Sequence, residues 1–144
     1  MSSYGENLFC NQLRLKGQTP LIPGKWLNVP VVNGTSQTAT ATVAASDFVL
    51  GETNYLYCVL STPASPVPSQ TLTITMPNRF DWDNWTVEVS VQYATTPSSS
   101  LNYEIIEQSG VILLRRINPA AGNVAGVDNT KLYFRVMPRG LAPL

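Results

Sequence analysis

The sequence predicts an all-β fold: an antiparallel β-sandwich or jelly-roll-like barrel of about eight strands, with extended N- and C-terminal tails. Three observations lead to this prediction. Apolar and polar residues alternate with period two along most of the chain, turn-forming residues separate these segments, and apolar residues nowhere recur at helical spacing over three turns. The 144 residues show no repeat and no boundary, so we expect a single domain spanning residues 1–144.

The alternating segments define the strands one by one. In QTATATV, residues 37–43, and TLTITM, residues 71–76, threonines occupy one face and apolar residues the other. WTVEVSVQY, residues 85–93, is the cleanest case, and its expected inward side chains are Trp85, Val87, Val89, Val91 and Tyr93. Further strands are predicted over residues 8–16, 25–32, 55–61, 101–107, 111–118 and 130–137.

Turn chemistry separates these strands. The Asn33-Gly34 pair joins two strand-like segments, and both residue types tolerate the positive φ of a type I′ hairpin turn. The prolines of STPASPVPSQ, residues 61–70, predict an extended surface loop because proline cannot donate a ladder hydrogen bond. Residues 95–100 and 118–129 are two further predicted loops, and residues 43–51 are expected to contain one short helical turn.

The charge content argues against nucleic-acid binding. The formal net charge is zero and only 12% of the residues are charged, so the chain offers no cluster of Lys and Arg for phosphates. The adjacent pair Arg115-Arg116 lies in an apolar strand, whose alternation sends the two side chains to opposite faces. Low net charge favours association, which indicates that a partner covers part of the surface.

The absence of histidine from the sequence argues against an enzyme. It removes the commonest metal ligand, the Ser-His-Asp and Cys-His arrangements and the usual zinc sites. We expect no catalysis, no metal and no cofactor. Cys10 and Cys58 are predicted to be small buried hydrophobic residues, with a disulfide between them as the alternative. No secretory signal or membrane-spanning run is recognisable, so we expect synthesis in a host cytoplasm, no secretion and no membrane partner.

The stretch RFDWDNW, residues 79–85, gathers most of the candidate chemistry. Asp81 and Asp83 are at a spacing that a glycosidase carboxylate pair permits, and Trp82 and Trp85 are able to stack on sugar rings. Such carboxylates usually come from different elements that line a cleft, and a calcium loop would need a glycine turn and a closing glutamate. We therefore predict the corner of a β fold, with Asp and Asn side chains bonding local amides. A binding surface that uses Trp82 is the alternative.

The ends of the chain and a few aromatic residues are the candidate contact regions. Residues 1–7 are expected to form an N-terminal arm and residues 138–144 a C-terminal tail, each held by its own domain or by a neighbouring subunit. Trp, Tyr and Arg dominate interface hot spots, although Trp26 and Trp82 also suit ordinary core or rim positions. The candidate interface residues are Tyr4, Leu8, Phe9, Trp26, Trp82, Arg139, Leu141 and Leu144.

In length, strand content, tail arrangement and neutral, Thr/Ser/Pro-rich composition, the chain resembles the small capsid decoration (cement) proteins of tailed bacteriophages. The resemblance covers the whole chain in overall style, is carried by no single motif, and assigns no role to any residue. It implies a non-enzymatic viral structural protein on the capsid surface of the virion, which binds the outside of a phage capsid and stabilises it by bridging capsomers. The implied partners are the major capsid protein and copies of the chain itself, as a homotrimer.

Two other functions fit the same sequence. One is another virion component of similar architecture, such as a tail or head-fibre protein. The other is a carbohydrate-binding β-sandwich module that presents Trp26, Trp82 or Trp85 to sugar rings. Tryptophan fluorescence measured with and without oligosaccharides separates this module from a cement protein.

Overall fold

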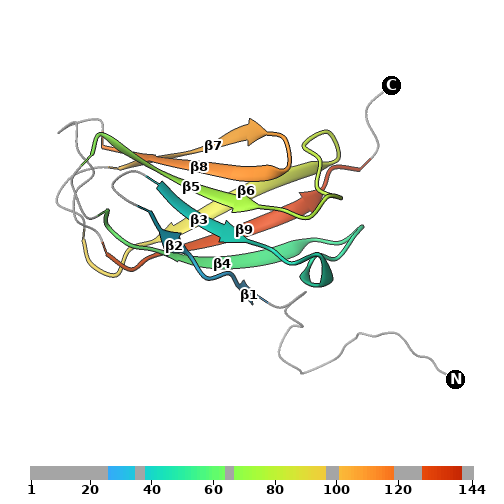
Figure 1. Cartoon of the computed structure of the whole chain (residues 1–144), viewed down its shortest axis with the longest axis horizontal. Helices are drawn as coiled ribbons and strands as arrows, with labels where there is room; N and C mark the ends of the chain where they lie inside the picture. The colour runs from blue at the N-terminus through green and yellow to red at the C-terminus, as the bar shows by residue number, and fades with distance from the viewer. Residues whose placement is uncertain (1–25, 35–37, 64–66, 97–100, 119–127, 141–144) are drawn as a thin grey trace, which may run out of the picture.

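The computed structural model describes residues 26–34, 38–63, 67–96, 101–118 and 128–140, and it shows two β-sheets packed face to face (Figure 1). The four-stranded sheet has the spatial order β1 (Leu27–Asn28), β4 (Asn54–Leu60), β9 (Thr130–Pro138) and β6 (Trp85–Gln92). The five-stranded sheet has the order β2 (Val32–Asn33), β3 (Thr38–Thr42), β5 (Ser69–Thr75), β8 (Val111–Ile117) and β7 (Asn102–Gln108). The predicted all-β sandwich is thus confirmed, whereas the strand predicted over residues 8–16 lies outside the described residues.

The inward faces of the two sheets share one apolar core. Along β4, β5, β8 and β9 buried and half-buried residues alternate, as the period-two pattern predicts. The inward face predicted for residues 85–93 is confirmed up to Val91: Trp85 is buried and Val87, Val89 and Val91 pack against the core, whereas Tyr93 follows the end of β6 and is half-buried. The largest fully buried apolar side chains are Phe134, Leu56, Leu60, Leu72, Ile74, Ile112, Leu114 and Leu132.

The expected helical turn is present, and it lies where the chain passes from one sheet to the other. It is the 3-10 turn η1 (Ala45–Asp47), between β3 and β4. After β4 the chain returns to the five-stranded sheet, where β5 pairs with β3 in parallel orientation. The β1–β4 pair is also parallel, so both sheets are mixed rather than purely antiparallel. Alternation in the sequence reports which face a residue occupies but not the direction of its neighbouring strand.

The strand predicted over residues 25–32 is two short strands in different sheets. β1 pairs with β4 and β2 pairs with β3, and Pro30 lies between them. Proline has no amide hydrogen for a ladder bond, so the pairing stops there and the chain crosses to the other sheet. Val29, which donates its amide to the carbonyl of Tyr57 at 2.8 Å, is the last residue held by the four-stranded sheet.

The predicted type I′ turn at Asn33-Gly34 is wrong, although β2 and β3 do form an antiparallel hairpin. Asn33 is the last residue of β2 and pairs with Ala39, so the connection is longer than two residues. Among the described residues positive φ occurs at Asn129, Gly51, Gly110 and Gly140, and not at this pair. A glycine is required at position 34 because Thr38 lies too close for a side chain: a Cβ there would be 2.5 Å from Thr38 Oγ1 and 3.0 Å from the Thr38 carbonyl oxygen.

The sandwich has two different ends. At one end, which we call the exit end, β1 begins, β4 begins and β9 finishes, with Asn54 paired to Val136 (Figure 1). The opposite end, the loop end, carries the connections β4–β5, β6–β7 and β8–β9. The chain therefore enters and leaves the described fold at the same end. No helix within the described ranges has the length and apolar character needed to cross a membrane.

Candidate binding surface

Four aromatic side chains gather on the outer face of the four-stranded sheet. Tyr57 on β4 pairs directly with Tyr133 on β9, with ring centroids 5.1 Å apart. Trp26, just before β1, places its ring edge-on against Tyr55 at 5.0 Å and against Tyr133 at 5.2 Å. The Trp26 side of this cluster remains in contact with solvent, because the residue is 39% exposed. We call these four residues the aromatic cluster.

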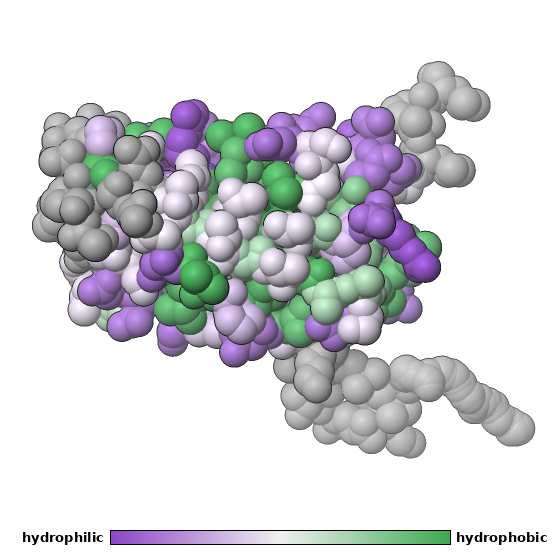
Figure 2. All heavy atoms as spheres, in the orientation of Figure 1, coloured by the Kyte–Doolittle hydropathy of each residue, from purple (hydrophilic) through white to green (hydrophobic). Residues whose placement is uncertain are grey.

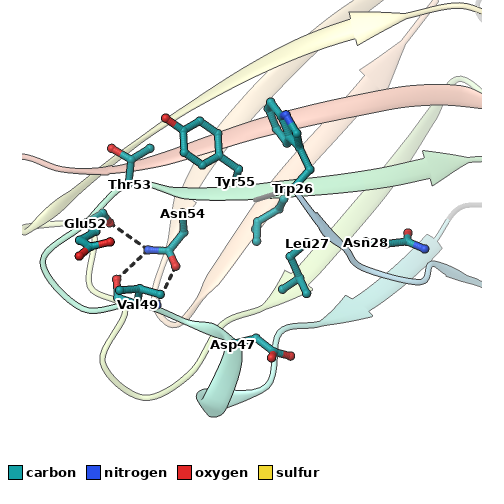
Figure 3. A pocket seen from close by; sticks show the side chains of 10 residues that line it. Trp26, Leu27, Asn28, Asp47, Val49, Glu52, Thr53, Asn54 and Tyr55 are labelled. Atoms are coloured by element: carbon teal, nitrogen blue, oxygen red, sulfur yellow. Dashed lines mark hydrogen bonds between the residues drawn. The ribbon is translucent and has the colours of Figure 1, made fainter. Parts of the chain in front are cut away.

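A hollow of about 530 Å³ lies beside Trp26, at the exit end of β4 (Figure 3). Among the described residues, its lining combines apolar side chains with two carboxylates and includes no Lys or Arg. The lining residues are Trp26, Leu27, Asn28, Asp47, Val49, Glu52, Thr53, Asn54, Tyr55 and Leu56. We call this space the β4 hollow. In Figure 3, Trp26 and Tyr55 point to one side of the strands and Leu27 and Asp47 to the other.

The turn that borders the β4 hollow is held by Asn54. Its Oδ1 accepts the amide of Val49 at 2.7 Å, and its Nδ2 donates to the carbonyls of Val49 at 2.8 Å and Glu52 at 3.0 Å. Gly51 supplies the positive φ, 81°, that the turn requires. Because the turn is fixed in this way, Val49 and Leu50 remain 47% and 56% exposed. Val49 thus adds an exposed aliphatic side chain to the hollow that Trp26 also lines.

The stretch 79–85 is a structural corner, as predicted. Asp81 accepts the amide of Asp83 at 3.0 Å through Oδ1 and the side-chain amide of Asn84 at 3.1 Å through Oδ2. Trp82 is half-buried, and its indole N–H points at two carbonyls of the β7–β8 turn, those of Gln108 and of Val111, the latter at 3.0 Å. Trp85 is buried against Phe48, with ring centroids 5.0 Å apart. The corner therefore uses its charged and indole groups to close the exit end.

A second, more open hollow of about 450 Å³ lies at this corner, lined in part by Asp81, Trp82, Asp83 and Glu107. Within the described part of the chain, no three Cys, Asp or Glu side chains are grouped closely enough to hold a metal ion. Trp82 lines this hollow whereas Trp26 lines the other. The two tryptophans proposed for the interface thus belong to separate surfaces.

The most unusual internal feature is a buried arginine, which the sequence placed on the face opposite to Arg115 without indicating its burial or its partners. Arg116 is fully buried at the loop end, in β8 of the five-stranded sheet. It donates to Thr130 Oγ1 at 3.3 Å, to the carbonyl of Ser61 at 3.3 Å and to Gln70 Oε1. Thr130 is the first residue of β9, and Ser61 directly follows β4. Both strands belong to the four-stranded sheet, so the guanidinium links the two sheets. The alternation did carry a signal, since Arg116 has the same parity as the core residues Ile112 and Leu114.

The remaining predicted residues are placed as follows. Arg139 is exposed at the exit end, where its amide donates to the carbonyl of Asn84 at 2.8 Å. Cys58 is buried and free, as predicted, and burial raises the pKa of its thiol to about 12. The positions outside the described residues are Tyr4, Leu8, Phe9, Cys10, Leu141 and Leu144.

Comparison with known proteins adds no assignment, because no protein-family model, curated protein or solved structure matches this chain. The function therefore has to be argued from the surface chemistry and from the sequence.

Proposed function

We propose that this protein is a non-enzymatic virion structural protein that binds the outside of a phage capsid and bridges neighbouring capsomers. The observation that supports a binding role is the exposed side of Trp26, which the aromatic cluster holds in place beside the β4 hollow. A tryptophan that is held in place and partly exposed is typical of an interface hot spot. The capsid as the partner is inferred from the resemblance in length, composition and tails.

The surface chemistry suits many modest contacts better than one strong contact. The protein has zero formal net charge, and the face in Figure 2 interleaves apolar residues with near-neutral and hydrophilic ones. A standard interface buries about 800 Å² on each partner, which one sheet face and its flanking turn are able to supply. In a homotrimer on a lattice, three such contacts act together through effective concentration, so each of them need not be tight.

The proposal is tested first by the solution mass and then by capsid binding. Light scattering is expected to give a trimer, and the trimer is expected to co-sediment with undecorated capsids of its source phage at a fixed stoichiometry. Trp26→Ala should weaken this binding on the order of tenfold or more. Val32→Ala is the matched control, because Val32 is 66% exposed but belongs to the five-stranded sheet. A monomer that does not bind capsids contradicts the proposal.

A carbohydrate-binding module is the second candidate, favoured by the exposed Trp26 next to polar groups of the β4 hollow. The ring geometry weakens this candidate. Trp26 stands at 70° to Tyr55 and at 80° to Tyr133, so the cluster offers no flat platform on which successive sugar rings would stack. A saturable shift of tryptophan fluorescence with oligosaccharides, lost in Trp26→Ala, would favour the module over the capsid protein.

A further inference from the structure

Asn33 and Gly34 form the dipeptide that is most prone to spontaneous deamidation. In this reaction the backbone nitrogen of the next residue attacks the asparagine side chain, and glycine permits the attack most readily because it has no side chain to obstruct it. Asn33 is the only asparagine of the sequence that precedes a glycine. Both residues are exposed in the structure, so water reaches them. The rate of the reaction therefore depends on the conformation of this pair.

The fold requires the glycine of this pair. A Cβ at position 34 would lie 2.5 Å from Thr38 Oγ1 and 3.0 Å from the Thr38 carbonyl oxygen, which is part of the backbone of β3. A residue with a side chain would slow the attack on Asn33, but it does not fit at position 34 without displacing β2 from β3. The reactive pair is therefore retained because the two strands approach each other closely.

The same close approach restrains the reaction. Gly34 donates its backbone amide to the Thr38 carbonyl at 2.7 Å, and Asn33 is paired with Ala39. The attacking nitrogen has to lose the proton that this hydrogen bond holds, and it has to turn toward the Asn33 side chain. Both steps need a local opening of the hairpin. β2 has only two residues, and such a short segment opens at a lower free energy than a long core strand.

We propose that Asn33 is a site of spontaneous deamidation whose rate is set by opening of the β2–β3 hairpin. The Gly34 nitrogen forms a bond to Asn33 Cγ, and the side-chain nitrogen leaves as ammonia, taking up the proton that Gly34 gives up. Water then opens the resulting cyclic imide at one of its two carbonyls. Cleavage of the new bond at Cγ gives aspartate, and cleavage of the original peptide bond gives isoaspartate. This inference does not depend on the capsid proposal.

The two products change the protein in different ways. Each adds a negative charge to a chain whose formal net charge is zero. Isoaspartate also inserts a methylene group into the main chain, so the Val32–Thr40 pair and the bond from Gly34 to Thr38 no longer share one register. Deamidation thus makes an ageing molecule more acidic and, through isoaspartate, loosens its β2–β3 hairpin.

Peptide mass spectrometry of the intact chain tests the proposal. The protein is incubated at mildly alkaline pH, once folded and once in guanidinium chloride, and the conversion of each asparagine is followed over time. Asn102 is the internal control, because it is exposed on β7 and is followed by Tyr103. In denaturant Asn33 should convert far faster than Asn102. In the folded protein Asn33 should convert roughly tenfold more slowly than in denaturant, since the reaction follows the open population.

Val32→Gly tests the dependence on hairpin opening. Val32 is 66% exposed, so its replacement spares the core and loosens only β2. The folded-state rate at Asn33 should rise roughly two- to fivefold, and the rate in denaturant should not change. Asn33→Gln should abolish the signal, because the larger ring closes far more slowly, and circular dichroism checks that both variants fold. Equal conversion of Asn33 and Asn102 in denaturant overturns the proposal, as do equal rates at Asn33 in folded and denatured protein.

Discussion

Arg115 and Arg116 are neighbours in the chain with opposite surroundings. Arg115 forms a 3.0 Å ion pair with Glu104 on the outer face, with both side chains roughly two-fifths exposed. Arg116 faces inward and is hydrogen-bonded to groups of both sheets. An arginine thus contributes little to stability at position 115, whereas at position 116 it holds the two sheets together at the loop end.

The two arginines should differ strongly in their contribution to stability. Arg116→Met leaves the buried oxygens of Gln70, Ser61 and Thr130 without this donor, and we expect the free energy of unfolding to fall by about 3 kcal/mol. Arg115→Met removes only an exposed ion pair and should cost less than about 1 kcal/mol. Urea denaturation of both variants measures the difference. Equal losses would mean that Arg116 does not link the sheets.

Asp128 gives the loop end a dependence on pH. The carboxylate accepts the backbone amide of Thr62 at 2.7 Å, and this bond lowers the pKa of Asp128 below its ordinary value of 3.8. A carboxyl whose pKa is lower in the folded state stabilises the fold above its unfolded pKa, and this contribution is lost as the pH falls through the folded pKa.

Asp128→Asn retains an oxygen acceptor but does not titrate. The stability difference between wild type and this variant should therefore be constant between about pH 6 and about pH 5 and should shrink below about pH 4. Urea denaturation at several pH values measures this difference, in which the titration of other carboxyl groups cancels. A difference that grows toward acid pH would contradict the assignment.

At this scale the sequence predicts faces well and partners poorly. Alternation correctly separated Arg115 from Arg116 and turned Trp85 inward. It could not show that Arg116 would meet Gln70 and Ser61, which lie 46 and 55 residues away in the sequence. Similarly, the orientation of the Trp26 ring depends on its contact with Tyr133, which lies far away in the sequence on β9.

Among the elements, the corner before β6 shows how a short polar stretch closes a sandwich. Its Asp81 bonds stay within the turn, whereas the Trp82 indole reaches the β7–β8 turn of the other sheet. The ring also packs edge-on against Phe80, with centroids 5.3 Å apart. Trp82 therefore links the two sheets, and only the part of its side chain that remains exposed is available to a partner.

Replacing Trp82 by phenylalanine separates its two contributions. Trp82→Phe keeps an aromatic ring near Phe80 but loses the N–H donor, and we expect a loss of about 1–2 kcal/mol in the free energy of unfolding. Trp26→Phe, at an exposed position where the indole has no such bond to the described residues, should cost less than about 1 kcal/mol. Thermal or urea unfolding compares the two. A larger loss for Trp26 than for Trp82 would contradict the role of the corner.

The elements were predictable to the extent that they depend on local pattern. The sequence predicts strands over residues 85–93, 111–118 and 130–137 because in each segment one face is more buried than the other; that face is fully buried in most of β8 and β9 and mostly half-buried in β6. The parallel β3–β5 pair was not predictable, because direction depends on a crossover through the opposite sheet. The prediction of a type I′ turn at Asn33-Gly34 was wrong for a related reason. A glycine is required at position 34 because Thr38 leaves no space for a Cβ, and not because the residue adopts a positive φ.

On the scale of the whole molecule, a single core joins both sheets, and the polar links at its two ends also cross between them. The apolar inner face of each sheet is buried only by packing against the other sheet. We therefore expect one cooperative unfolding transition, in which far-UV circular dichroism and tryptophan fluorescence give the same urea midpoint. Separate midpoints would show that the exit end or one sheet melts independently of the core.

The common end at which the chain enters and leaves the fold gives the molecule a direction. Any surface that holds the protein through its exit end turns the β4–β5, β6–β7 and β8–β9 connections away from that surface. The strands that these connections join are already held by the core. Inserting a foreign sequence there would therefore cost mainly the entropy of closing a longer loop. The sandwich is in this sense a natural display scaffold: a peptide placed in one of these connections would lie at the end opposite to the one where the described fold begins and finishes.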